Sequence, residues 1–464
     1  MGLAQNINQA PNSYMKYLFY ILLSYISFIF IIGIFGKGYT ALSSLIIVMS
    51  SCFLIIFSLI YVFSKLIFKK VDYFIVGSII FIQALIGMLH FIFVINNNYF
   101  IDSSSGIDIT EAATTIFFDG YYWDVFYFTY LMDLIAQARI ENGYFAINIL
   151  EAPHKNYFMA YLISDIFYFG DNYPLNFQAV NILSLFYSGI VLSLLSMKLF
   201  NIRDVNKLRT IFYLTILQPL AWIPSHSMRD IVGAFFVILS VSLIFFSVGR
   251  VQKAFSYTIS LVLVFQHRSI YFISILGSIF LRNIFLIKKE AGFISIVFFV
   301  LIFSLLTVSL SDNLVSGLIK IAQDSQQNSL VSQGNSSSFY HLLKLIVGPF
   351  PWTQYYDGSV SGYATYYSST IVLQAAWHLC ILYFLIINIK TIISKKITRH
   401  YLYNVLLFGI PAIFSLGGMN LYLLPSFILA IPLLNKISAK RFFLTYIVIV
   451  CTYIVFSTIY FFIK

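Results

Sequence analysis

The feature that most constrains this chain is a series of long apolar runs that recurs from Tyr17 to the C-terminus. A run of about 20 apolar residues is long enough for a helix to cross the hydrocarbon core of a bilayer. Only 10% of the 464 residues are charged, whereas a soluble protein carries about a quarter. The sequence therefore predicts an all-α, polytopic helical membrane protein that forms a single integral membrane domain over residues 1–464.

The apolar runs define about thirteen expected transmembrane spans, several of them shorter than a full bilayer crossing. Their approximate ranges are 17–35, 41–64, 73–95, 177–197, 209–223, 231–248, 254–266, 269–287, 291–310, 367–389, 401–417, 420–435 and 442–463. The run 254–266 is the weakest of these, and the apolar stretch 157–170 is a candidate for a further short or re-entrant helix. Two long segments, 96–176 and 311–366, are the large loops of this arrangement.

The distribution of charge predicts the orientation of these spans. With a cytoplasmic N-terminus and alternating spans, 20 of the 28 Lys and Arg residues lie on the cytoplasmic side, together with only 3 of the 17 acids. Cytoplasmic loops of membrane proteins carry such an excess of cations. The net charge of +11 therefore reports membrane orientation and does not imply nucleic acid. Both long loops are expected to lie outside.

Two short polar hinges interrupt the apolar runs on the expected outer side, and each contains an arginine, Arg229 or Arg268. Both arginines are expected in the first turn of a helix that enters the membrane from outside. The helix dipole disfavours a cation there unless an anion is bound. A guanidinium group binds phosphate oxygens in bidentate fashion, so both residues are candidate diphosphate ligands. The alternative is that they reach lipid headgroups or pair with loop carboxylates.

Other polar residues of the hinges are candidates for proton transfer. His226 and His267 stand beside the two arginines, where an imidazole can carry a proton or donate to a phosphate. The alternative for both is a satisfied polar residue at the membrane interface. Asp230 has capping-box spacing from Ser227, which favours a capping or salt-bridge role over a catalytic one.

The two long loops contain the remaining candidates. Asp119 and Asp124 flank an aromatic run in the first loop, where carboxylates suit activation of a sugar hydroxyl and rings suit sugar faces. The alternative is a solvated acidic loop. In the second loop, Lys344 is a further cation for a diphosphate, and His341 and Trp352 are candidate substrate contacts. No spacing typical of metal ligands occurs, so no metal and no other cofactor is expected.

With these features in place, the chain resembles the bacterial O-antigen and capsule repeat-unit polymerases of the Wzy type. The resemblance is architectural, and the residues that carry it are Ser227–Asp230, Arg268 and the turn Gly348–Trp352. It implies an inverting glycosyltransferase of the GT-C class in the bacterial inner membrane, which uses neither a nucleotide sugar nor a metal. The arginine-rich loop motif of some members, Arg and then Gly after ten residues, is absent from both loops.

The resemblance also implies the substrate and the site. A growing glycan would pass from undecaprenyl diphosphate to the terminal sugar of another lipid-linked repeat unit. Arg229 and Arg268 would hold the diphosphate, and a carboxylate or histidine would take the acceptor proton. A chain-length regulator protein and membrane lipid are the expected partners, and nucleic acid is not.

Proteins of other classes remain as alternatives. A GT-C transferase that uses a lipid monophosphate sugar carries an acidic motif after its first span, where this chain has only Lys37 as a charge. An O-antigen ligase that acts on lipid A core is a related alternative. A lipid-linked oligosaccharide flippase or another transporter would line its spans with charges and have short outer loops. This chain keeps nearly all its charges at the ends of its apolar runs.

Overall fold

The computed structural model describes a large part of the chain, with gaps. The described residues are 13–35, 41–96, 135–143, 161, 164–169, 176–219, 228–267, 275, 362–395, 397–398, 400–405 and 423–463. Within these ranges every regular element is a helix and no β-strand occurs, so the predicted all-α class is confirmed for this part of the chain. The chain divides into two compact units. Unit 1 contains Met1–His267 and Asp357–Thr370, and unit 2 contains Arg268–Tyr356 and Ile371–Lys464.

Three of the described helices are long and apolar enough to cross a membrane. Their apolar parts are Tyr14–Phe35, Ala179–Phe200 and Ala439–Phe456. Shorter apolar helices cover Ile46–Val62, Asp230–Phe246, Leu373–Ile387 and Leu424–Leu434. These lengths and compositions indicate a helical membrane protein, and the expected number of about thirteen spans stays a prediction.

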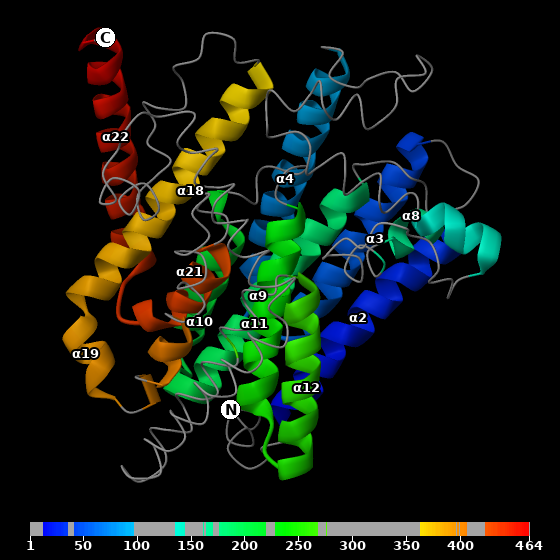
Figure 1. Ribbon diagram of the computed structural model, residues 1–464, viewed down its shortest axis with the longest axis horizontal. Coiled ribbons are helices and arrows are strands. Elements are labelled where there is room, and N and C mark those ends of the chain that lie inside the picture. Colours follow the sequence, from blue (N-terminus) through cyan, green and yellow to red (C-terminus); the bar gives the residue numbers. More distant parts are fainter. Residues whose placement is uncertain are drawn as a thin grey trace, which may run out of the picture. The chain divides into compact units, whose positions relative to one another are not determined.

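Unit 1 is organised around α9. Its described helices include α2 (Ser13–Phe35), α3 (Ala41–Val62), α4 (Lys70–Asn96), α8 (Asp165–Phe169), α9 (Asn176–Phe200), α10 (Val205–Ile216), α11 (Met228–Phe246) and α12 (Arg250–His267). Helix α9 lies in the middle of them and packs against α2, α3, α4, α10 and α11 (Figure 1). The apolar part of α9 is 94% buried, compared with 28% for that of α2.

Small side chains allow these helices to approach α9 closely. Ser184, Ser188, Ser193 and Ser196 of α9 are all buried, and each of the last three donates its hydroxyl to the carbonyl four residues earlier in the helix. Helices that associate inside a membrane use such small residues at their contacts. The buried face of α9 is therefore built for close packing.

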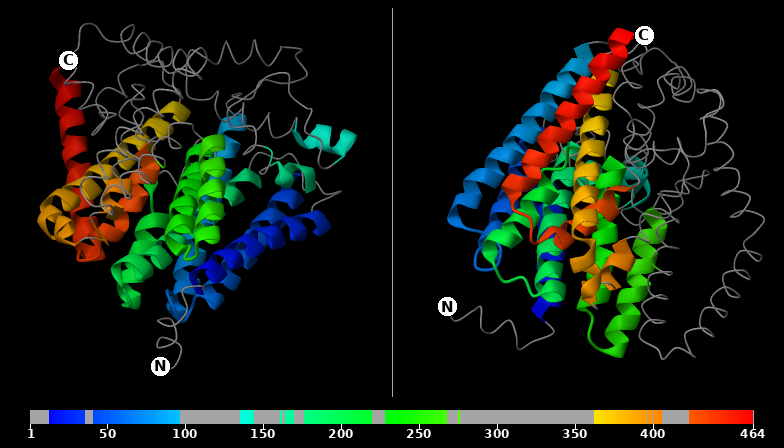
Figure 2. Two further views of the ribbon diagram at one scale, coloured as in Figure 1. Left: turned by 60° about the horizontal axis from the view of Figure 1, so that its bottom comes forward. Right: turned by 90° about the vertical axis from the view of Figure 1, so that its left-hand side faces the viewer.

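Helix α12 has its polar side inward and its apolar side outward. Ser260 donates its hydroxyl to the Ser240 carbonyl of α11 at 3.1 Å, and the Ser240 hydroxyl reaches the Ser260 carbonyl at 3.5 Å. On the opposite side of α12, Val251 is 84% exposed and Phe255 is 65% exposed. Figure 2 shows α11 and α12 (green) side by side as a helical hairpin. This polarity is the reverse of that of a helix on a soluble protein and suits a helix that faces lipid.

Most of the described basic residues of unit 1, with the exceptions of Arg139 and Arg229, gather at one end of the helices, which we call the basic end. The Tyr14 ring of α2 stacks on Phe246 of α11 with centroids 5.2 Å apart, and the Lys198 ammonium of α9 lies 5.4 Å from the same tyrosine ring. Arg209 of α10 forms a salt bridge with Asp72 of α4. The starts of α2, α4 and α10 therefore lie at the same end as the last turns of α9 and α11.

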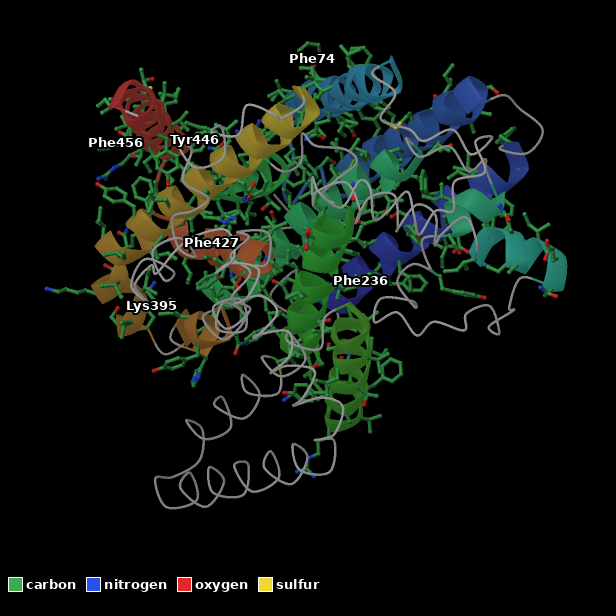
Figure 3. All side chains as sticks on the ribbon, turned by 45° about the horizontal axis from the view of Figure 1, so that its top comes forward. Phe74, Phe236, Lys395, Phe427, Tyr446 and Phe456 are labelled. Carbon is green, nitrogen blue, oxygen red and sulfur yellow. The ribbon has the colours of Figure 1, made fainter. Side chains whose placement is uncertain are left out.

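Unit 2 is built around an aromatic cluster between two helices. Its described elements are the part of α18 (Gly362–Ile387) from Ile371 onward, α19 (Ile389–Ser394), α21 (Leu424–Ala430), the 3-10 helix η5 (Ile431–Leu434) and α22 (Ala439–Ile463). The Trp377 ring lies 4.9 Å from Phe442 and 5.1 Å from Tyr446 of α22. The Tyr446 hydroxyl donates to the Leu373 carbonyl at 3.3 Å. Figure 3 shows Tyr446 on α22 and Phe427 on α21.

Candidate functional site

Helix α11 gives Arg229 its position. The helix begins at Met228, so Arg229 and Asp230 lie in its first turn, as the sequence predicts. Because the last residue of α11, Phe246, lies at the basic end, this first turn lies at the opposite end of the hairpin. The length of α11 therefore separates Arg229 from the cations at the basic end.

The hairpin register brings His267 to the same end as Arg229. Ser240 and Ser260 lie opposite each other, and an α-helix rises about 1.5 Å for each residue. Arg229 is then about 16 Å along α11 from this contact, and His267, the last residue of α12, is about 10 Å along α12 in the same direction. The backbone of His267 is therefore about one helical turn closer to the Ser240–Ser260 contact than that of Arg229.

The other predicted site residues lie outside the described residues, and their roles stay predictions. They are Asp119, Asp124, His226, Arg268, His341, Lys344 and Trp352. Helix α12 ends at His267, immediately before the second hinge arginine. The roles of these residues therefore rest on the sequence alone.

The structure reveals a buried arginine that the sequence analysis did not select. Arg139 lies in a helical piece of the segment 96–176, and its side chain is wholly buried. Its Nη2 atom donates to Asp165 Oδ1 at 2.6 Å. Its Nη1 atom donates to Ser164 Oγ at 2.7 Å and to the Tyr161 carbonyl at 3.2 Å. The rings of Tyr161 and Tyr168 lie 4.5 Å and 5.0 Å from the guanidinium carbon.

Arg139 joins two folded pieces of the segment 96–176, the helical piece that carries it and the residues around Asp165. A buried ion pair tolerates the loss of neither partner, and the two rings add cation–π attraction. The α8 helix that carries Asp165 packs against α2, where a Cβ added at Gly33 would lie 3.1 Å from Phe169 Cδ1. The signal in the sequence was a segment with ten acids in which the only cations are Arg139 and Lys155. A lone arginine among acids and aromatic residues is a strong candidate for burial.

A second charged network ties the basic end together. The Arg209 guanidinium donates to both carboxylate oxygens of Asp72, with Nη2 2.6 Å from Oδ1 and Nε 2.9 Å from Oδ2. Tyr213 donates its hydroxyl to Asp72 Oδ1 at 2.5 Å, and the Lys69 amide donates to Oδ2 at 2.5 Å. The Lys69 ammonium also donates to Asn206 Oδ1 at 2.7 Å. These bonds join the first turn of α4, and the residue before it, to α10.

The protonation of Asp72 follows from these contacts. Burial by itself would raise the pKa of this carboxyl group. The hydrogen bonds from Arg209, from Tyr213 and from the Lys69 amide outweigh burial and hold the pKa of Asp72 below its usual range. Asp72 is therefore ionised at neutral pH, and its charge is neutralised locally by Arg209.

Within the part of the chain that the structure describes, no group of three or more His, Cys, Asp or Glu side chains is placed to hold a metal ion. No protein-family model, curated protein or solved structure matches the chain. What the chain does therefore has to be inferred from its own residues.

Proposed function

We propose that the chain is a membrane-embedded glycosyltransferase that polymerises undecaprenyl-diphosphate-linked oligosaccharide repeat units at the outer face of the bacterial inner membrane. The observation that carries the proposal is the separation of charge along the α11–α12 hairpin. Exposed Arg250 and Lys253 mark the start of α12 at the basic end, and Arg229 lies in the first turn of α11 at the other end. The basic end is cytoplasmic by the positive-inside rule, which puts Arg229 outside.

In this proposal Arg229 binds the diphosphate leaving group. In the proposed reaction the bond between the anomeric carbon of the donor glycan and undecaprenyl diphosphate breaks, and the acceptor sugar oxygen bonds to that carbon. The diphosphate leaves with the electron pair of the broken bond. A guanidinium group at a helix start supplies both a full positive charge and nearby free N–H groups for this leaving group.

The proton of the acceptor hydroxyl needs a base. His267 lies at the same end of the hairpin as Arg229, about one turn closer to the Ser240–Ser260 contact, and a neutral imidazole can take a proton near pH 7. Asp119 and Asp124 are the alternative bases, from the segment 96–176. Part of that segment is folded through Arg139 and Asp165, and α8 packs against α2. The described part of this segment is thereby held in place and can support a binding surface for a glycan.

The test is complementation of a bacterial strain that lacks its own repeat-unit polymerase, with glycan ladders read on gels. The wild-type chain is expected to restore ladders. Arg229→Ala is expected to leave glycan of a single repeat at normal protein levels. The matched control is Arg250→Ala, which removes an exposed arginine from the opposite end of the same hairpin and is expected to leave the ladders intact.

Three outcomes contradict the proposal. Full ladders from Arg229→Ala remove the diphosphate role of this residue. Equal loss in both arginine variants indicates a general effect on the hairpin. If deletion of the gene in its own host leaves no lipid-linked repeat unit exposed on the outer surface, the chain acts as a flippase.

A further inference from the structure

The basic end of unit 1 presents a compact cationic surface formed by two turns that are distant in the sequence. The turn between α3 and α4 carries Lys65 and Lys69, and Lys70 is the first residue of α4. The turn between α9 and α10 carries Arg203 and is flanked by Lys198 of α9 and Lys207 of α10. All six side chains are exposed. We call this set the cationic surface.

Buried side chains and contacts with α10 hold the two turns in place. In the first turn, Phe63, Ile67 and Phe68 are buried in the unit. The Phe68 ring lies 4.8 Å from Phe212 of α10. The second turn is anchored by buried Ile202. The Lys69–Asn206 hydrogen bond joins the first turn to α10, which follows the second turn, and the Asp72–Arg209 salt bridge joins α4 to α10. The cations therefore project from a fixed backbone.

Few acids oppose these cations. The acids of the described residues from Lys65 to Lys207 at this end are Asp72 and Asp204. Asp72 is buried and neutralised by Arg209, and Asp204 caps α10 by accepting from the Asn206 amide at 2.9 Å. The surface therefore keeps a large positive excess that is available to an anionic partner.

Exposed apolar side chains lie directly beside the lysines. Phe74, in the second turn of α4, is 77% exposed, and Tyr61, in the last turn of α3, is 75% exposed. Figure 3 shows Phe74 at the outer edge of α4. Val71 is also exposed, one residue after Lys70. A partner for this region must therefore have a negatively charged group that meets the lysines and an adjacent hydrocarbon part that meets Phe74 and Val71.

We infer that the cationic surface binds anionic phospholipid. Lys65, Lys69 and Lys70 contact the headgroup phosphate, and an acyl chain lies along Phe74 and Val71. Basic segments next to a membrane-spanning helix attract anionic lipid through this combination of charge and apolar contact. The site lies at the opposite end of the helices from Arg229, so it is independent of the proposed polymerase activity.

The experiment measures lipid preference beside the surface. Full-length protein with Phe74→Trp is placed in phosphatidylcholine vesicles that contain phosphatidylglycerol, and one of the two lipids is brominated to quench tryptophan. The signal of the parent protein is subtracted, so that only position 74 is read. The ratio of the association constants of the two lipids is then compared in variants. The test variant is Lys65→Gln/Lys69→Gln/Lys70→Gln.

A matched control removes the same charge from exposed lysines elsewhere. Lys395→Gln/Lys436→Gln/Lys440→Gln changes three exposed residues of unit 2. The phosphatidylglycerol preference at position 74 is expected to be about fivefold or more, the contribution of one cation near an anionic headgroup. It falls to about one in the test variant and is unchanged in the control.

A preference near one in the Phe74→Trp protein overturns the inference, and so does an equal fall in both triple variants, which indicates a diffuse surface potential. If the test variant folds poorly, Lys70→Gln alone decides the question. This exposed single change is expected to lower the preference at least about twofold, and an unchanged preference rejects the site.

Discussion

Gly189 of α9 offers the sharpest test of the packing in unit 1. A Cβ atom added there would lie 2.7 Å from Phe212 Cδ2, 3.0 Å from Phe212 Cε2 and 3.5 Å from Ile216 Cγ2. The Phe212 ring cannot easily withdraw, because it is wholly buried and packs edge-on against Phe68 at 4.8 Å and Phe186 at 5.3 Å. Gly189→Ala must therefore push α10 away from α9 or distort the ring cluster.

Two opposing effects determine the change in the free energy of unfolding of Gly189→Ala. Overpacking of a filled core costs about 1–3 kcal/mol, and a clash this close belongs at the upper end. Replacement of glycine by alanine within a helix stabilises the helix by about 1 kcal/mol. Gly189→Ala is therefore expected to lower the free energy of unfolding by about 2 kcal/mol. The control is Gly249→Ala, where no atom lies within 4 Å of the added Cβ and the effect should stay within about 0.5 kcal/mol.

The assay is equilibrium unfolding of the full-length protein in mixed micelles, with Phe212→Leu added to each background. Loss of the ring edge gives the new methyl group room, so Phe212→Leu should cost at least about 1 kcal/mol less in the Gly189→Ala protein than in wild type. If Gly189→Ala is as stable as Gly249→Ala, the added methyl group does not clash with Phe212. Additive effects of the two changes at 189 and 212 would contradict the predicted clash in the same way.

Three further predictions concern polar contacts. Asp72→Asn is expected to lower the free energy of unfolding by about 1–3 kcal/mol at pH 7. Because the folded pKa of Asp72 is depressed, its contribution is fully present above the unfolded pKa of about 4 and is lost as pH falls below it. The loss of wild-type stability below that pH should therefore be smaller in Asp72→Asn, as measured by acid titration of melting temperature. Arg139→Gln removes the guanidinium that neutralises the buried Asp165 carboxylate and should speed hydrogen exchange across 161–169, whereas Arg139→Gln/Asp165→Asn should exchange more slowly than the single variant. Ser260→Leu should force α11 and α12 apart and lower the yield of folded protein, and Ser260→Ala should not, as measured by size-exclusion chromatography.

In the part of the chain that the structure describes, apolar runs predicted the positions of several helices. The expected span 177–197 corresponds to α9 (Asn176–Phe200), and 73–95 corresponds to α4 (Lys70–Asn96). Helix α10 begins at Val205, before the expected start at 209, since its polar first turn is capped by Asp204 and lies outside the apolar run. Apolar character therefore locates the membrane part of a helix, and capping residues locate its start.

The environment of each helix could not be predicted in the same way. Of the two helices of unit 1 that are long and apolar enough to span a membrane, α2 is the more hydrophobic, and yet only 28% of its apolar part is buried, compared with 94% for that of α9. A helix that faces lipid must be apolar all round, whereas a helix buried among others can use serine and glycine for close contacts. Composition alone therefore ranks these two helices in the wrong order of burial.

The candidate site could be predicted only in part. The polar hinge before 231 indicated a helix start, and α11 does begin at Met228. The pairing of Arg139 with Asp165 joins residues 26 positions apart across a segment with no periodic pattern. Such a contact depends on tertiary folding, so neither spacing nor hydropathy could reveal it.

The most direct test of the central claim is chain extension by the purified protein in phospholipid vesicles. The substrate is undecaprenyl-diphosphate-linked single repeat units, extracted from a strain that lacks a polymerase. Wild type is expected to produce glycans of increasing length and to release one undecaprenyl diphosphate for each new bond. Arg229→Ala should be slower by about 100-fold or more, and Arg250→Ala should match wild type. No chain extension by the wild-type protein, or equal rates for wild type and Arg229→Ala, would contradict the account.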